Sequence, residues 1–227
     1  MSAKPARTRP IPDQPLEYKT SFMQRTLDLV SRGYVQWVGG TVKVERLPRL
    51  RAKFAANYGT AADEAQRRRM RRHDVPREWL VIHAAKDADH AQWLLLAEPG
   101  HPMTVLESPA DALLRDSRIQ IPLKANQWAD YELLRRDGAW TWCMTQERRQ
   151  AWRERIHNAV RQPDPEQRRK DMRQLAWSLA HVPGFRGIRN DAKKFVDLAR
   201  KDWKRVHRGP VPARLRYPGW VRRMRHE

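Results

Sequence analysis

The hydrophobic pattern of the chain changes near residue 146, and this change limits the folds open to it. Before that point, short apolar segments alternate with turn-forming residues; beyond it, apolar residues recur every three or four positions. Alternation is typical of strands, and the longer spacing is typical of helices. The sequence therefore predicts an α+β fold, in which an N-terminal antiparallel sheet with helices over residues 16–145 is followed by a basic C-terminal helical domain over residues 146–208.

The elements expected in the N-terminal part are short and are separated by turn signals. Helices are expected over residues 16–31, 48–58, 61–72 and 109–115, and strands over residues 34–37, 41–44, 79–83, 92–97, 118–123, 128–134 and 139–145. Gly39-Gly40 and Asp137-Gly138 are dipeptides that favour tight hairpin turns, so each predicts a hairpin. A Pro-rich arm over residues 1–15 precedes these elements.

Three helices are expected in the C-terminal part. Trp152, Ile156 and Val160 follow one another at four-residue spacing, which predicts one face of a helix over residues 146–161. Two further helices are expected over residues 166–180 and 188–207, and a basic tail over residues 209–227.

Positive charge is concentrated in this C-terminal part. The 227 residues contain 46 Lys+Arg and 26 Asp+Glu, a net charge of +20, and residues 147–227 alone contain 23 basic and 9 acidic residues. Such an excess opposes folding through self-repulsion and usually serves a polyanionic partner. DNA or RNA is the partner class that we expect, contacted mainly through phosphates, which give affinity without sequence information.

The residues expected to contact nucleic acid form two clusters and part of the tail. They are Arg67, Arg68, Arg69, Arg71 and Arg72; Arg186, Arg189, Lys193, Lys194, Lys201, Lys204, Arg205 and Arg208; and Arg222 and Arg223. The alternative is that these are solvated helix faces, since Asp191, Asp197 and Asp202 interrupt the second cluster and could pair with it.

The junction over residues 179–195 carries a motif of its own. Pro183, Gly184, Phe185 and Gly187 are similar to the helix-hairpin-helix element, in which a Pro-Gly-apolar-Gly turn joins two short helices, although here two residues separate the glycines. The resemblance implies that the turn amides and the N-terminus of the next helix bind phosphate. A corner that needs glycine only for its geometry, or a DNA-reading helix-turn-helix, are the alternatives.

A weak catalytic hypothesis rests on His83, Asp87, Asp89 and His90 around one loop. Two imidazoles and two carboxylates could bind a metal or supply acid–base chemistry, but their spacing matches no known metal motif and polar loops commonly contain them. No phosphate-cradling loop or nucleophile elbow occurs. We therefore expect no metal, no cofactor and, more weakly, no enzymatic activity.

The remaining composition bears on where the protein works. Cys143 is the one cysteine, so the chain can form no internal disulfide and no cysteine-rich zinc site, which favours a cytoplasmic protein. No apolar run is long enough to span a membrane.

Together these features predict a nucleic-acid-binding protein. Its preference for arginine and its ten tryptophans resemble accessory proteins of GC-rich bacterial plasmids, phages and integrative elements, which implies a replication, transfer or regulatory factor of a mobile element. Two alternatives stay open: a nuclease or RNA-processing enzyme that uses His83 or His90, and a structural subunit of a nucleoprotein complex that also contacts protein subunits.

Overall fold

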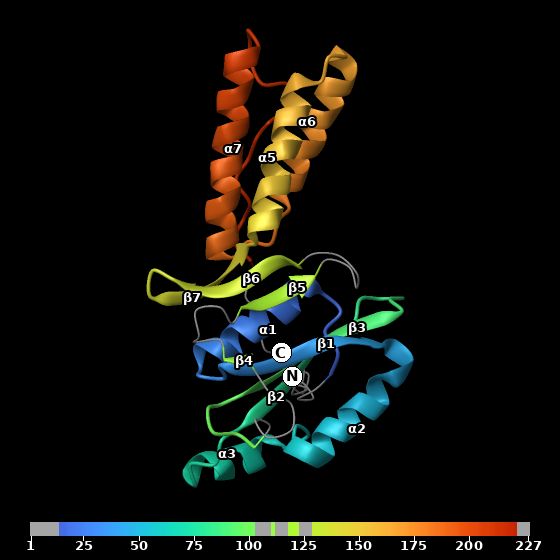
Figure 1. The fold of residues 1–227 in the computed structure, drawn as a ribbon, viewed down its shortest axis with the longest axis vertical. Helices are drawn as coiled ribbons and strands as arrows, with labels where there is room; N and C mark the ends of the chain where they lie inside the picture. The colour runs from blue at the N-terminus through green and yellow to red at the C-terminus, as the bar shows by residue number, and fades with distance from the viewer. Residues whose placement is uncertain (1–13, 103–109, 112–117, 123–128, 222–227) are drawn as a thin grey trace, which may run out of the picture. The chain divides into compact units, whose positions relative to one another are not determined.

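A computed structural model describes residues 14–102, 110–111, 118–122 and 129–221. These residues divide into two compact units, the first ending at Arg118 and the second beginning at Ile119. Both units combine α-helices with an antiparallel sheet (Figure 1). The predicted α+β class is confirmed. None of the described helices is long and apolar enough to cross a membrane.

The first unit is built on an antiparallel sheet whose strands lie in the order β2-β3-β1-β4. The strands are β1 (Gln36–Lys43), β2 (Glu78–His83), β3 (His90–Ala97) and β4 (Ala110–Asp111). The expected pairing of residues 79–83 with 92–97 is confirmed, with Val81 opposite Leu94. The central position of β3 explains its near-continuous apolar sequence, because both of its faces are covered.

Helices cover the two faces of this sheet. The helices of the unit are α1 (Lys19–Ser31), the 3-10 turn η1 (Val44–Arg46), α2 (Leu47–Tyr58) and α3 (Glu64–Arg72). Phe54 of α2 packs with Leu80 and Leu95 in one buried cluster. Phe22 of α1 lies beside His83, whose side chain projects from the other face because it alternates with Leu80 and Ile82 along β2. The apolar face of each amphipathic helix thus supplies half of a two-sided core.

The hairpin predicted at Gly39-Gly40 is wrong. Both glycines lie inside the continuous strand β1, where Gly39 is opposite Leu94 of β3. A Cβ atom on Gly39 would lie 2.5 Å from Cδ2 of Leu94, so this glycine allows a close approach of strand and side chain rather than a turn.

The helix predicted over residues 109–115 is also wrong where the structure describes it. Ala110 and Asp111 form β4, in which Ala110 pairs with Trp37 of β1. Ser108-Pro109 favours a helix start at this point, but the signal is local, and pairing with a distant strand overrides it. The other residues of that predicted helix, most of the Pro-rich arm, and Arg222 and Arg223 lie outside the described residues.

The second unit consists of a three-stranded sheet and three helices. The strands β5 (Ile119–Pro122), β6 (Ala129–Arg136) and β7 (Ala139–Met144) form a meander, and α5 (Gln146–Arg161), α6 (Pro165–Ala180) and α7 (Arg186–Val206) follow (Figure 1). The hairpin at Asp137-Gly138 is confirmed, with φ of 51° and 75° at its two central residues. Positive φ at both positions is what a type I′ turn requires.

The boundary between the units lies between Arg118 and Ile119 and not near residue 146, where the hydrophobic pattern changes. The reason is that strands β5–β7 belong to the same unit as the three C-terminal helices. The carboxylate of Asp191 on α7 accepts a hydrogen bond of 3.1 Å from the Met144 N–H. The Gly187 N–H, at the start of α7, donates to the Thr141 hydroxyl over 3.0 Å. These long-range bonds join α7 to β7, and sequence periodicity carries no information about them.

Candidate nucleic-acid interface

The exposed face of α7 carries a row of lysines. Its opposite face is buried through Ile188, Phe195, Ala199 and Trp203, as the sequence spacing predicts. At about 100° per residue, the four exposed lysines fall within an arc of about 100° and span about 16 Å along the helix axis. They are Lys193, Lys194, Lys201 and Lys204. Within the described part of the chain, none of them forms a hydrogen bond or an ion pair.

The three acids of α7 are held by other partners. Asp191 is buried and lies 3.8 Å from Arg136 and 3.6 Å from Arg149. Asp202 lies 3.4 Å from Arg205. Asp197 accepts a hydrogen bond of 3.1 Å from the Tyr217 hydroxyl. Asp191 and Asp202 therefore neutralise arginines. Asp197, which also lies 3.4 Å from Arg200, is exposed and falls within the arc of the lysines, so it offsets part of their positive charge.

Residues 209–221, the described part of the predicted tail, are packed along α7. Arg200 donates to the Leu215 carbonyl over 3.0 Å, and Arg189 donates to the Pro218 carbonyl over 3.0 Å. Arg189 also lies 3.7 Å from the ring centre of Trp220. Arg214 and Arg216 of this segment, and Arg208 just before it, add exposed side chains to the basic surface of the unit.

The turn that resembles a helix-hairpin-helix element is covered by the chain itself. The Gly184 carbonyl accepts a hydrogen bond from the Val221 N–H over 3.0 Å, and a Cβ on Gly184 would lie 2.2 Å from the Gly219 carbonyl oxygen. A Cβ on Gly187 would lie 2.3 Å from Sγ of Cys143. Both glycines thus allow close packing, which was the alternative interpretation of this turn.

Arg186, the first residue of α7, is occupied in the same way. Its guanidinium donates to the carbonyls of Arg136 and Ala139 at the β6–β7 turn. Arg186 therefore holds the hairpin against the helix. Arg205, another residue expected to bind phosphate, is exposed but pairs with Asp202.

The arginine cluster of α3 has a different character. Arg67 is only 7% exposed; it donates to the Glu78 carbonyl over 2.5 Å and to the Thr60 carbonyl over 2.9 Å. Its guanidinium also lies 3.9 Å from the ring centre of Trp79. Arg67 is thus an element of the core. Arg68 pairs with Glu64 over 2.5 Å, and this hydrogen bond raises the pKa of Arg68.

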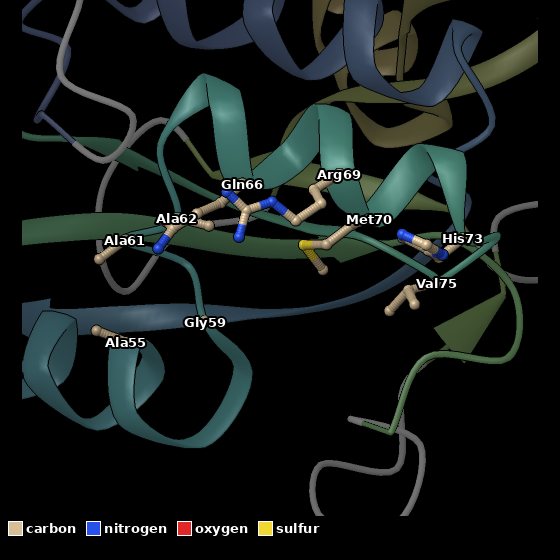
Figure 2. A pocket seen from close by; sticks show the side chains of 9 residues that line it. All are labelled: Ala55, Gly59, Ala61, Ala62, Gln66, Arg69, Met70, His73 and Val75. Carbon is tan, nitrogen blue, oxygen red and sulfur yellow. The ribbon is translucent and has the colours of Figure 1, made fainter.

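The other three arginines of α3, namely Arg69, Arg71 and Arg72, are exposed and lie in its last turn. Positive charge there stabilises the carbonyl end of the helix dipole. Arg69 also lines a hollow of about 650 Å³ between α3 and the end of α2. Figure 2 shows Gln66 and Met70 of α3, and His73 just beyond its end, beside Arg69 and above Ala55 of α2. The lining is largely apolar, which does not resemble a phosphate site.

The residues of the weak catalytic hypothesis lie at the β2–β3 loop. Nδ1 of His83 is 2.8 Å from the Leu16 carbonyl oxygen, while Asp87, Asp89 and His90 are exposed. Among the residues that the structure describes, no group of three or more His, Cys, Asp or Glu side chains is placed to hold a metal ion.

The core of the second unit contains two groups whose ionisation is suppressed. Burial raises the pKa of the Tyr131 phenol to about 12 and that of the Cys143 thiol to about 11. Trp142 beside them is fully buried. Tyr131 and Trp142 thus serve the core of the unit.

Sequence reasoning missed Trp177 and Arg173 on α6. Trp177 is 63% exposed, whereas Met172, Leu175 and Leu179 of the same helix are buried. A helical projection would have found it, because at about 100° per residue Trp177 falls well outside the arc of those three residues.

Comparison of the chain with protein-family models, with curated proteins and with solved structures found no match.

Proposed function

We propose that the protein binds nucleic acid through the phosphate backbone and that α7 carries the main contact surface. The observation that carries this proposal is the row of four exposed lysines, none of which forms a hydrogen bond or an ion pair with a described residue. Point charges on flexible stems, spread over about 16 Å of one helix face, suit a polyanion with many equivalent phosphates. Arg208, Arg214 and Arg216 extend the same charge beside α7.

Arg69, Arg71 and Arg72 supply a second, weaker contact region on the first unit, since their side chains are exposed. Arg67 and Arg186 are excluded from the interface because their guanidinium groups bind main-chain carbonyls. An accessory role in the replication, transfer or regulation of a bacterial mobile element rests on composition alone, as does a cytoplasmic location.

The salt dependence of binding tests the proposal. The full chain is titrated against a fluorescent duplex and fluorescent single strands over a range of salt concentrations. Each phosphate contact contributes about −0.9 to the log–log slope on duplex DNA and about −0.7 on a single strand. Replacing Lys193, Lys194, Lys201 and Lys204 by alanine should therefore reduce the duplex slope by about 3 to 4.

A control variant removes the same charge from exposed residues of the first unit: Arg46, Arg49, Lys53 and Lys86 to alanine. Its slope should stay close to that of the unmodified chain. Weak or salt-insensitive binding to every nucleic acid would overturn the proposal, and an equal loss in the two variants would remove α7 from it.

A further inference from the structure

A pocket of about 400 Å³ lies on the second unit between α6 and residues 212–216. Its lining combines an exposed aromatic pair, Trp177 and His181, with three arginines, Arg173, Arg214 and Arg216. Pockets of this size hold small ligands or parts of larger ones. An aromatic surface next to several positive charges favours a ligand that has both a flat ring and a negatively charged group.

Trp177 is an aromatic platform open to a ligand. Its side chain is 63% exposed, and its ring stacks on His181 with 4.3 Å between ring centres and 26° between ring planes. Nδ1 of His181 lies 2.7 Å from the Trp177 carbonyl oxygen, which fixes the imidazole beneath the indole. The stack covers one face of the indole only, so the ring is held in place while remaining accessible.

The three arginines bring uncompensated charge to the same place. Arg173, Arg214 and Arg216 are exposed, and none of them has a hydrogen bond or an ion pair within the described residues. Asp171, the acid nearest in sequence on α6, accepts a hydrogen bond of 2.7 Å from Gln167. An anionic group in the pocket would therefore meet guanidinium groups that are free to form bidentate contacts.

The wall formed by residues 212–216 is held in place before any ligand binds. Leu215 is 7% exposed, and its carbonyl accepts the hydrogen bond from Arg200. The Leu215 N–H donates to the Ala213 carbonyl over 3.1 Å. Preorganisation of this kind lowers the entropy cost of binding.

We infer that this pocket holds an unpaired nucleobase of a single-stranded nucleic acid, stacked on Trp177, with the flanking phosphates bound by the three arginines. An exposed aromatic ring beside arginines is the arrangement that single-strand-binding proteins use. Bases within a duplex already stack on one another, so their faces are closed to Trp177. This inference rests on the proposed function. It narrows the expected ligand to single-stranded nucleic acid, whereas the lysines of α7 alone would bind a duplex and a single strand equally well.

The test compares probes that have the same phosphates but differ in their bases. Fluorescence anisotropy at low salt measures binding of the full chain to oligo-dT, oligo-rU, an abasic strand and a duplex, each of about 20 nucleotides or base pairs. Trp177→Ala should weaken binding to oligo-dT, oligo-rU or both by about 5- to 150-fold. It should change binding to the abasic strand and the duplex less than about twofold, because these offer no base to stack.

Two matched variants complete the experiment. Trp177→Phe keeps an aromatic ring and should recover most of the lost affinity, whereas Tyr18→Ala removes a ring of similar exposure from the first unit and should change nothing. An equal loss on abasic and base-containing strands, or no loss at all, would overturn the stacking inference. In that case salt-dependent binding would leave the proposed function intact, whereas absence of binding to every probe would overturn both. Whichever of oligo-dT and oligo-rU binds more tightly shows whether the protein prefers DNA or RNA.

Discussion

Two helices of this protein, α3 and α7, are rich in basic residues, yet the structure uses their charge differently. On α3, Arg67 is buried and Arg68 is paired, and the three exposed arginines lie in the last turn. On α7, the lysines lie along one face and the acids are committed to arginines. The comparison teaches that available charge depends on burial and pairing, and that counting basic residues does not reveal it.

The largest effect is expected from Arg67, the buried arginine of α3. Arg67→Ala removes three hydrogen bonds to main-chain carbonyls and leaves the buried Glu78 carboxylate without its arginine, 3.8 Å away. Nε2 of His101 still lies 3.1 Å from that carboxylate, but removing one partner of a buried ion pair costs about 3–5 kcal/mol. We therefore expect urea denaturation followed by circular dichroism to show a loss of this size in the free energy of unfolding.

Arg68→Ala is the matched control on the same helix. Its exposed i,i+4 pair with Glu64 is screened by solvent, so the Arg68 variant should lose only a small fraction of what the Arg67 variant loses. Similar losses in the free energy of unfolding of the two variants would contradict the assignment of Arg67 to the core and of Arg68 to the surface.

A second prediction concerns the buried acid of α7. Asp191→Asn removes the charge that faces Arg136 and Arg149, and it weakens the bond that holds the Met144 N–H. A loss of about 2–3 kcal/mol in the free energy of unfolding is expected, because a buried main-chain donor and two arginines lose a charged partner. Asp197→Asn, at an exposed site of the same helix, should cost less than about 1 kcal/mol.

The sequence predicted most of the helices and strands because their signals are local. The four-residue spacing of Trp152, Ile156 and Val160 gave α5 with its observed bounds, and Asp137-Gly138 gave a true hairpin. Gly39-Gly40 misled because a glycine required by a neighbouring side chain looks the same in sequence as one required by a turn.

The candidate site was less predictable, for a physical reason. Arg67 and Arg71 are both arginines on one helix, and only tertiary contacts with Glu78 and Thr60 make the first structural. Conversely, Trp177 is an apolar residue on a helix with a buried face, and only its position around α6 relative to Met172 shows that it is exposed. Side-chain partners that are distant in sequence decide which charges and rings remain available.

A third prediction compares the two helices in binding. The double variant Lys201→Ala, Lys204→Ala should lower affinity for duplex DNA about tenfold near physiological salt, through the loss of two phosphate contacts. Arg71→Ala, Arg72→Ala removes the same charge from α3 and should lower it less than about threefold. Fluorescence anisotropy on one labelled duplex measures both variants. The reverse order of effects would make α3 the main contact surface.

The smallest effect follows from the buried phenol in the unit that carries α7. Burial raises the pKa of Tyr131 from 10.0 to about 12 in the folded state, so the folded protein keeps a proton that the unfolded chain loses between these values. Stability from this group is complete below about pH 10 and falls as pH rises toward 12. At about pH 11 the loss should be about 1 kcal/mol.

Tyr131→Phe has no proton to lose, so its free energy of unfolding should fall less between about pH 8 and about pH 11 than that of the unmodified chain. The change with pH in each protein is the quantity to compare, because it cancels any constant cost of removing the hydroxyl. Parallel pH dependences in urea denaturation would mean that the phenol is accessible to water. The packing of β6 and β7 against α7 would then be looser than the 5% exposure of Tyr131 implies.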